Sequence, residues 1–141
     1  MEQQQVRALA QQFIDALHAL EQGGPENVDG LVALYSDDAH LTNAALKLAN
    51  DERRGADGIR HFWSEYKRTL GKAYSHFHQV TANEESAGLF WTTKGTNADG
   101  QPDAAEYDGV SLLVFNPEGK IRFFQGYYDT RQFNREMHIE K

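Results

Sequence analysis

The stretch NPEGKIRFFQGYYDTRQF, residues 116–133, predicts a turn followed by a strand. Asn, Pro and Gly are typical turn residues, and the aromatic residues that follow them are enriched in strands. Successive side chains of a strand point to opposite faces, so Asp129 shares a face with Tyr127, whereas Tyr128 and Phe124 point the other way. The strand is therefore expected to end in an acid that lies in mostly apolar company.

Further strands are predicted before this stretch. From Lys72 onward the chain is rich in aromatic and β-branched residues, and turn residues interrupt it at 82–86 (ANEES) and 97–103 (NADGQPD). Short strands separated by such turns are typical of an antiparallel sheet. A short strand is also predicted at 40–43, and residues 44–55 show no clear period.

The first half of the chain predicts three helices. Pro25 opens a short second helix, and a third helix runs from about Ala56 to Leu70, where Gly71 is a natural end. Helices followed by an antiparallel sheet indicate the α+β class, and because no linker divides residues 1–141 we expect one domain. The first helix is marked by apolar residues at three- and four-residue spacing: Val6, Leu9, Ala10, Phe13, Ile14, Leu17 and Leu20.

Composition excludes several classes of protein. The 141 residues carry a formal net charge of −7 and contain no cysteine. The negative charge disfavours binding to nucleic acid or to an anionic membrane, and no apolar run is long enough to span a bilayer. Without cysteine, disulfides and thiolate chemistry are excluded. We therefore expect a small molecule or a second copy of the chain as the partner.

We expect a cytoplasmic protein, because the chain has no cysteine and shows no signal peptide. Residues 1–13 (MEQQQVRALAQQF) have neither the basic region nor the unbroken apolar run of a signal peptide.

His76 and His78 lie two residues apart on one strand face, which is compatible with a metal site if His40 joined them. No spacing fixes a third ligand, so we expect these histidines at the surface or in a dimer interface. We expect neither a metal nor a cofactor.

The order and spacing of these segments resemble the nuclear transport factor 2-like superfamily, and within it the SnoaL-like, polyketide cyclase-like domains. The resemblance covers residues 6–133 and implies a cone-shaped fold, in which a curved antiparallel sheet wraps around three N-terminal helices and leaves an internal pocket. Such families include isomerases, cyclases, dehydratases and epoxide hydrolases as well as proteins that only bind ligands, so the fold does not fix the chemistry. The segments that carry the resemblance are LYSDDAHLTN (34–43), RGADGIRHFW (54–63), GLFWTTKGTNADGQ (88–101) and residues 116–133.

Two enzymes of this superfamily share few catalytic residues with the chain. Ketosteroid isomerases use a tyrosine, a carboxylate base and a hydrogen-bonding acid, and the positions that resemble these hold Phe13, Asn43 and Ser111. Limonene epoxide hydrolases have an asparagine similar to Asn43 and an aspartate similar to Asp129. The Asp and Arg that complete the catalytic triad of these hydrolases have no counterpart in FWTTKGT (90–96). We therefore expect neither reaction by those residues.

Asp129 is the candidate catalytic residue. SnoaL-like cyclases use a single aspartate as acid and base, and the resemblance implies that role for Asp129. Apolar surroundings disfavour a charged carboxylate, which would suit Asp129 to proton transfer. The alternative is that Asp129 caps the turn into TRQF and pairs with Arg131.

Two functions stay open for a pocket of this kind. One is an enzyme that cyclises, isomerises, dehydrates or hydrates a small hydrophobic molecule through Asp129, and the other is a non-catalytic module for ligand binding or dimerisation. Aromatic residues that face away from the pocket, such as Phe124 and Tyr128, would need cover, and a homodimer would provide it. The residues expected to contact the ligand are Phe13, Leu17, Leu41, Asn43, Trp63, Trp91, Ser111 and Tyr127.

Overall fold

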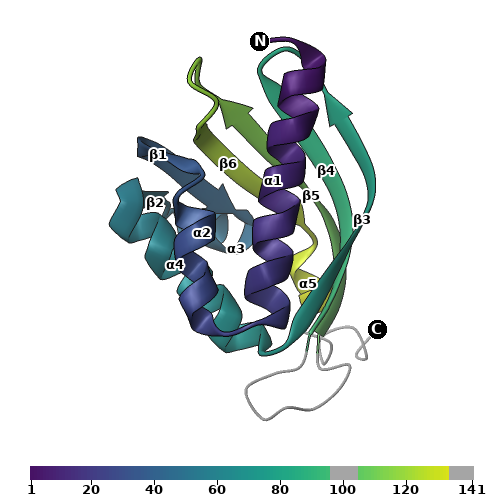
Figure 1. Cartoon of the computed structure of the whole chain (residues 1–141). Helices are drawn as coiled ribbons and strands as arrows, with labels where there is room; N and C mark the ends of the chain where they lie inside the picture. The colour runs from purple at the N-terminus through teal and green to yellow at the C-terminus, as the bar shows by residue number, and fades with distance from the viewer. Residues whose placement is uncertain (96–104, 134–141) are drawn as a thin grey trace.

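A computed structural model describes residues 1–95 and 105–133. The turn predicted at 97–103 lies outside the described residues. Within them, helices come first and most of a curved sheet follows, which confirms the α+β class (Figure 1). The buried hydrophobic side chains of both halves form one core cluster.

The three predicted helices are confirmed. Asp57 lies in the first turn of the third one, where an acid stabilises the positive end of the helix dipole. That helix ends at Gly71, whose φ of 64° is one that glycine adopts without strain. The helices are α1 (Gln3–Gln22), α2 (Val28–Val32), which follows the 3-10 turn η1 (Pro25–Asn27), and α4 (Gly55–Leu70).

Two short elements occupy the segment that shows no clear period in the sequence. They are α3 (Ala44–Leu48) and β2 (Arg53–Arg54). Asn43 begins α3, because its Oδ1 accepts a hydrogen bond from the Leu46 N–H at 2.8 Å. This cap ends the preceding strand and turns the chain toward β2.

The sheet has the strand order β2-β1-β6-β5-β4-β3. Its pairings are antiparallel, as predicted, except that of β1 with β6, which is parallel. The long connection from β1 through α4 permits this pairing, which a tight hairpin would not allow. The longer strands are β1 (Tyr35–Asn43), β3 (Ala73–Ala82), β4 (Ser86–Gly95), β5 (Ala105–Phe115) and β6 (Ile121–Tyr128).

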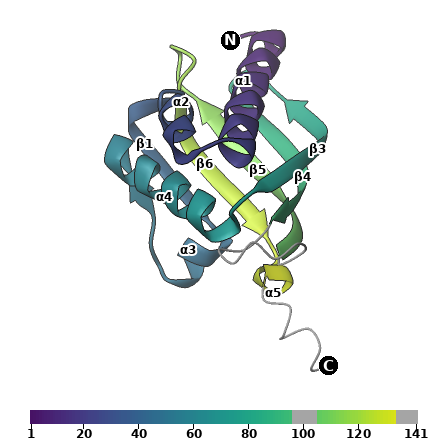
Figure 2. The same cartoon turned by 60° about the horizontal axis from the view of Figure 1, so that its bottom comes forward.

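The sheet bends around the helices and forms an unclosed cone. Helix α1 runs along the concave face and contacts β3 and β4, whereas α4 lies beside β1. Turning the molecule brings α3 and the short helix α5 (Thr130–Phe133) into view near the end of β6 (Figure 2). Residues of the sheet, of α1 and of α4 line one common cavity.

A β-bulge in the last strand changes which of its side chains face the helices. Phe115 of β5 pairs with Ile121, but Val114 pairs with Phe123, so that Arg122 is an extra residue in β6. An extra residue shifts the alternation of all the side chains that follow it. Residues after the bulge therefore point to the faces opposite to those predicted from an uninterrupted strand.

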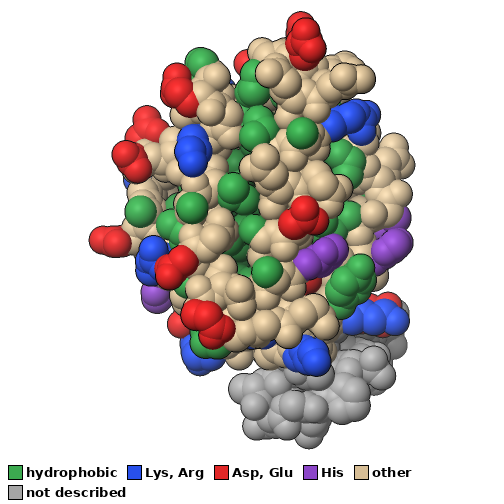
Figure 3. All heavy atoms as spheres, in the orientation of Figure 1, with side chains coloured by type: hydrophobic (Ala, Val, Ile, Leu, Met, Phe, Trp, Pro, Cys, Tyr) green, Lys and Arg blue, Asp and Glu red, His purple; other side chains and the backbone are tan. Residues whose placement is uncertain are grey.

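Charged side chains are scattered over the face of the molecule that carries α1 and α2 (Figure 3). Arg60 of α4 pairs with Asp29 of α2, an exposed contact that contributes little to stability. Among the described residues, none of the helices is both long and apolar enough to cross a membrane.

Candidate functional site

A cavity of about 330 Å³ lies between the concave face of the sheet and the helices. This volume suits a small ligand. Exposed lining residues mark its opening: Ala45 of α3 and His61 and Thr69 of α4. Nine of the lining residues are aromatic: Phe13, Phe62, Trp63, Tyr66, Phe77, Trp91, Tyr107, Phe124 and Tyr128.

The sheet side of the cavity is built from rows of residues that pair across neighbouring strands and so share a face. A row of hydroxyl side chains crosses β3, β4 and β5: Ser75, Thr93 and Tyr107. The next row is mostly aromatic and extends to β6: Phe77, Trp91, Gly109 and Tyr128. A third row reaches β1: Leu89, Ser111, Gly126 and Asn43.

Trp91 forms the middle of the sheet-side wall. Its indole Nε1 donates a hydrogen bond to Ser111 Oγ at 2.9 Å. The rings of Trp91 and Tyr107 meet edge to face, with centroids 5.3 Å apart. These contacts fix the indole in one orientation, as a preformed wall requires.

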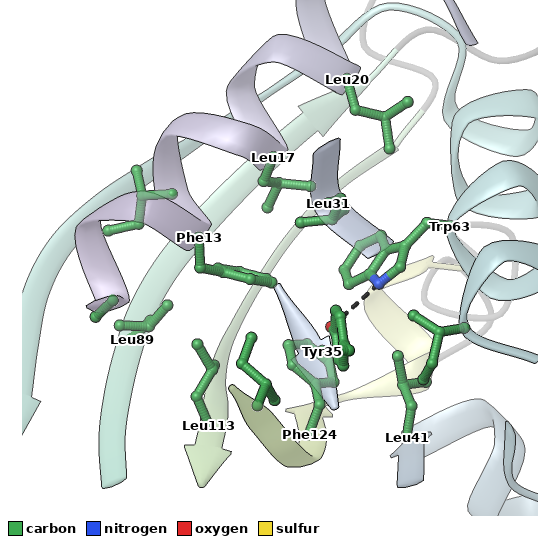
Figure 4. Close-up of a cluster of buried hydrophobic side chains, with 14 of the residues drawn as sticks. Phe13, Leu17, Leu20, Leu31, Tyr35, Leu41, Trp63, Leu89, Leu113 and Phe124 are labelled. Atoms are coloured by element: carbon green, nitrogen blue, oxygen red, sulfur yellow. Dashed lines mark hydrogen bonds between the residues drawn. The ribbon is translucent and has the colours of Figure 1, made fainter. Parts of the chain in front are cut away.

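The opposite wall is a cluster of rings from α1, α4 and β6 (Figure 4). The ring of Trp63 lies 6.0 Å from that of Phe13 and 5.6 Å from that of Phe124, centroid to centroid. Trp63 Nε1 donates a hydrogen bond to the Tyr35 hydroxyl at 3.1 Å. Burial raises the pKa of Tyr35, although the bond from Trp63 opposes that shift, so Tyr35 stays neutral.

A buried carboxylate lies behind the row of hydroxyls. Glu21, in the last turn of α1, is only 1% exposed. Its Oε2 accepts hydrogen bonds from Tyr66 Oη and Ser75 Oγ, each at 2.5 Å, and its Oε1 accepts one from the Ser75 N–H at 2.9 Å. Ser75 Oγ also lies 2.6 Å from Thr93 Oγ1. Because Tyr66, Ser75 and Thr93 line the cavity, three hydroxyls connect Glu21 to it.

The environment keeps the nearby tyrosines protonated. Burial, followed by the charge of Glu21, raises the pKa of Tyr66 well above its usual value. Burial also raises the pKa of Tyr107, with smaller contributions from Tyr128 and Glu21. Lys67 Nζ donates to the backbone oxygen of Glu21 at 3.0 Å, and burial lowers the pKa of Lys67 although Glu21 opposes that shift. The tyrosine hydroxyls therefore act as hydrogen-bond donors near neutral pH.

A second polar region lies in the row that reaches β1. The Oδ1 of Asn43 caps α3, which leaves the two hydrogens of Nδ2 for other acceptors. Ser111 Oγ accepts from Trp91, which leaves the hydroxyl proton of Ser111. Neither group has an acceptor for these hydrogens among the described residues, and both residues line the cavity.

Most of the residues predicted to contact a ligand do line the cavity. These are Phe13, Leu17, Asn43, Trp63, Trp91 and Ser111. Leu41 instead is fully buried in the core, away from the cavity lining. Tyr127 is 46% exposed on the outer face of the sheet, because the bulge in β6 turns Tyr128 inward in its place. For Leu41 and Tyr127 the predicted placement is wrong.

The structure places Asp129 outside the cavity. Its side chain is 42% exposed and pairs with the guanidinium of Arg131, with Nη2 3.0 Å from Oδ2. Asp129 Oδ1 also accepts a hydrogen bond from the Arg131 N–H at 2.9 Å. The expectation that this carboxylate turns inward is therefore wrong, and Asp129 has the cap-and-pair geometry of the alternative. Proton transfer by Asp129 inside the cavity gains no support from this placement.

The residues that sequence reasoning missed are Glu21 and the hydroxyls around it. Glu21 follows Leu17 by four positions and so continues the buried stripe of α1. A charged residue on an otherwise apolar stripe indicates a buried polar partner, and this signal was available. Thr93 follows Trp91 by two residues on β4, so the inward direction of Trp91 also implied that of Thr93.

The histidines are not grouped. His76 and His78 are exposed on β3, with their ring centroids 6.0 Å apart. His40 lies on β1, which three strands separate from β3, and its Nδ1 is 3.3 Å from Glu52 Oε1. Within residues 1–95 and 105–133, no group of three or more His, Cys, Asp or Glu residues is placed to hold a metal ion.

Comparison with protein families identifies one matching domain. The sequence profile of the SnoaL-like domain matches residues 10–124, which is most of the chain. No curated protein matches the chain.

Several solved structures share the fold. An NTF2-like protein of unknown function from Burkholderia pseudomallei K96243 superposes with a TM-score of 0.76 at 16% identity, covering 93% of this chain and 95% of that one. A SnoaL-like protein of unknown function from Burkholderia thailandensis E264 gives 0.69 at 16% identity, with 92% and 98% covered. An NTF2-like protein of unknown function from Exiguobacterium sp. 255-15 gives 0.69 at 20% identity, with 86% and 98% covered. At these identities the likeness concerns the fold.

Proposed function

Since the chain belongs to the SnoaL-like domain family and has the NTF2-like fold, we propose that it binds a small and mostly apolar molecule in the cavity between sheet and helices. The observation that carries the proposal is the aromatic lining, which offers a large apolar contact area around a volume of about 330 Å³. The hydroxyls of Tyr66 and Thr93 lie at one end, with Glu21 behind them, and would orient the ligand.

Intrinsic fluorescence offers a direct test. The two tryptophans of the chain, Trp63 and Trp91, both line the cavity, so a ligand that enters it changes their emission. A panel of small aromatic and polyketide-like molecules should include some that change this emission and also raise the melting temperature, because binding to the folded state stabilises it.

A blocked cavity supplies the control. Ala45→Phe places a ring at the opening, whereas Ala56→Phe places the same ring at an exposed position outside the cavity lining. The first variant should weaken the binding of every ligand found, and the second should leave it unchanged. If Ala45→Phe does not weaken any of them, the ligands bind elsewhere and the proposal is wrong.

Acid–base catalysis is the second candidate function, and Tyr66 supports it better than Asp129 does. Tyr66 lines the cavity, and its Oη donates to Glu21 Oε2 at 2.5 Å. A proton that leaves a bound substrate would pass to Tyr66 Oη as the Tyr66 proton passes to Glu21 Oε2, and the reverse transfer would return it to another atom of the substrate. This relay suits an isomerase, cyclase or hydratase acting on a small hydrophobic molecule.

Exchange of carbon-bound hydrogen tests this second function. A bicyclic ketone such as 2-decalone has no hydroxyl group and would bind with the hydrogens beside its carbonyl group next to Tyr66. Incubated with the protein in deuterated water, it should gain deuterium at these positions faster than in buffer. Glu21→Gln removes the proton acceptor and should return the rate to that of buffer. Equal exchange with the native protein and in buffer would leave the protein as a binder of such ketones rather than an enzyme acting on them.

We also propose that the chain forms a homodimer through the outer face of its sheet. Phe90, Val110 and Tyr127 pair across β4, β5 and β6 and form one row on that face. Phe90 is 37% exposed and Tyr127 is 46% exposed. A row of partly exposed apolar side chains on a sheet is the kind of surface that a second copy covers.

A further inference from the structure

The hydroxyl protons around Glu21 can be assigned one by one. Tyr66 and Ser75 each have one hydroxyl proton, and both direct it to Glu21 Oε2. The contact between Ser75 Oγ and Thr93 Oγ1 at 2.6 Å must then use the proton of Thr93. The protons of Tyr66 and Thr93 therefore point to Glu21 and Ser75, and on the cavity side Tyr66 Oη and Thr93 Oγ1 offer lone pairs that accept hydrogen bonds.

The backbone contacts of Glu21 fit this assignment. Oε1 accepts from the Ser75 N–H, so both carboxyl oxygens of Glu21 act as acceptors. The nearby ammonium of Lys67 reaches the backbone oxygen of Glu21 and leaves the carboxylate to its hydroxyl donors. A buried carboxyl group with three hydrogen-bond donors is a satisfied buried group.

The other polar region of the cavity has the opposite character. The Nδ2 hydrogens of Asn43 and the hydroxyl proton of Ser111 have no acceptor among the described residues, so this region donates. Ser111 lies four residues beyond Tyr107, the partner of Thr93, along β5. Four residues of a strand span about 13 Å, which accommodates a small bicyclic molecule with a polar group at each end together with the hydrogen bond that each end makes.

We propose that the cavity selects an apolar molecule that carries a hydroxyl group at the end near Tyr66 and Thr93 and a carbonyl oxygen at the end near Asn43 and Ser111. The hydroxyl donates to the lone pairs that Glu21 leaves exposed, and the carbonyl accepts from the amide and the serine. This inference rests on the proposed binding function and adds to it the polarity and orientation of the ligand.

Two bicyclic probes of the same size and shape separate the two ideas. They are 6-hydroxydecahydronaphthalen-2-one and decahydronaphthalene-2,6-dione, which share one ketone and differ only in whether the second oxygen can donate. Titration against the emission of Trp63 and Trp91 gives both dissociation constants. With the native protein, the hydroxy ketone should bind about tenfold more tightly, as one hydrogen bond gained against one repulsive contact implies.

Substitution of the carboxylate tests the cause. In Glu21→Gln the amide carbonyl can keep the bond from the Ser75 N–H, while the amide nitrogen donates to Tyr66 and Ser75. Ser75 would then donate its hydroxyl proton to Thr93 instead of to residue 21. The hydroxyl protons of Tyr66 and Thr93 must then turn toward the cavity. The diketone should bind more tightly to this variant than to the native protein, and the preference for the hydroxy ketone should disappear.

Thr92→Val provides a matched control for the strand. Thr92 precedes Thr93 but points to the other face, where it donates to Asp108. Thr93→Val should weaken the binding of the hydroxy ketone more than that of the diketone, whereas Thr92→Val should leave both dissociation constants unchanged.

The outcomes separate the two proposals. Equal binding of both probes to the native protein, or tighter binding of the diketone, would overturn the assigned polarity and leave the binding function standing. If neither these probes nor the wider panel changes the tryptophan emission, both proposals are wrong. An unchanged preference in Glu21→Gln would show that Glu21 does not set it.

Discussion

The indole of Trp91 lies against the backbone of Gly109, its partner across β4 and β5. A Cβ on residue 109 would come within 2.6 Å of two carbons of the indole and 2.4 Å of the backbone oxygen of Tyr127. Real side chains do not approach so closely, and both obstacles are held in place, one by the sheet and one by the bond to Ser111. The wall of the cavity therefore depends on a residue without a side chain.

Gly109→Ala should destabilise the protein and disturb the cavity. Overpacking of this kind costs about 2 kcal/mol. Urea unfolding measures the loss, and the tryptophan emission should shift because Trp91 is displaced. Gly30→Ala is the control, since a Cβ at Gly30 meets nothing within 4 Å and alanine favours the helix by about 1 kcal/mol. A similar loss in both variants would contradict the steric argument.

Glu21→Leu should destabilise the protein more than Glu21→Gln does. Leucine leaves the Ser75 N–H and the hydroxyls of Tyr66 and Ser75 without their acceptor, at about 3 kcal/mol. Glutamine keeps one acceptor and supplies donors to hydroxyls that can turn, so we expect a loss of about 1 kcal/mol. The free energy of unfolding in urea gives both values, with the exposed Glu84→Leu as the baseline. Equal losses would mean that packing, rather than hydrogen bonding, sets the requirement at this position.

Stability should fall as the pH rises above about 10. Burial raises the pKa of four tyrosines above the value near 10 that they have when unfolded: Tyr35, Tyr66, Tyr107 and Tyr128. In that range the folded chain holds protons that the unfolded chain releases. The unfolded state therefore becomes more stable relative to the folded state with each increase in pH. Urea unfolding across the alkaline range measures the slope. Tyr35→Phe removes one of these four hydroxyls and should reduce the slope.

The sequence predicted the helices and the strands well because their signals are local. The apolar stripe of α1 and the glycine after α4 are readable from spacing and backbone preference alone. The parallel pairing of β1 with β6 depends on which distant strand supplies a partner, and nothing in residues 35–43 encodes it.

The predicted site failed where one residue changed the pattern of a strand. The extra Arg122 in β6 is visible only when β5 and β6 are paired, and it exchanges the directions of Tyr127 and Tyr128. By contrast, Phe13, Leu17 and Trp63 were placed correctly, because helical stripes carry no such interruption. Glu21, a polar residue on one of those stripes, indicates the polar part of the site better than Asp129 at the end of the strand does.

A charged residue on the outer face of the sheet should prevent the proposed dimer. Tyr127→Lys introduces a charge at the end of the row that begins with Phe90, and a charge that must be desolvated in an interface is unfavourable. Sedimentation velocity should show the native chain as a dimer and the variant as a folded monomer. Leu48→Lys, on α3 at 78% exposure, should remain dimeric. A native chain that sediments as a monomer across the concentration range would rule the dimer out.

Asp129→Asn should leave the cavity and its chemistry unchanged. The carboxylate is partly exposed, lies outside the cavity lining and contacts Arg131, so its loss should cost no more than about 1 kcal/mol. The two bicyclic probes should bind the variant as they bind the native protein, and deuterium exchange into 2-decalone should keep its rate, whereas Glu21→Gln changes both. If Asp129→Asn instead abolishes exchange while its urea unfolding stays near that of the native protein, then the strand-end acid reaches the substrate in another conformation and the relay through Tyr66 is not the catalytic route.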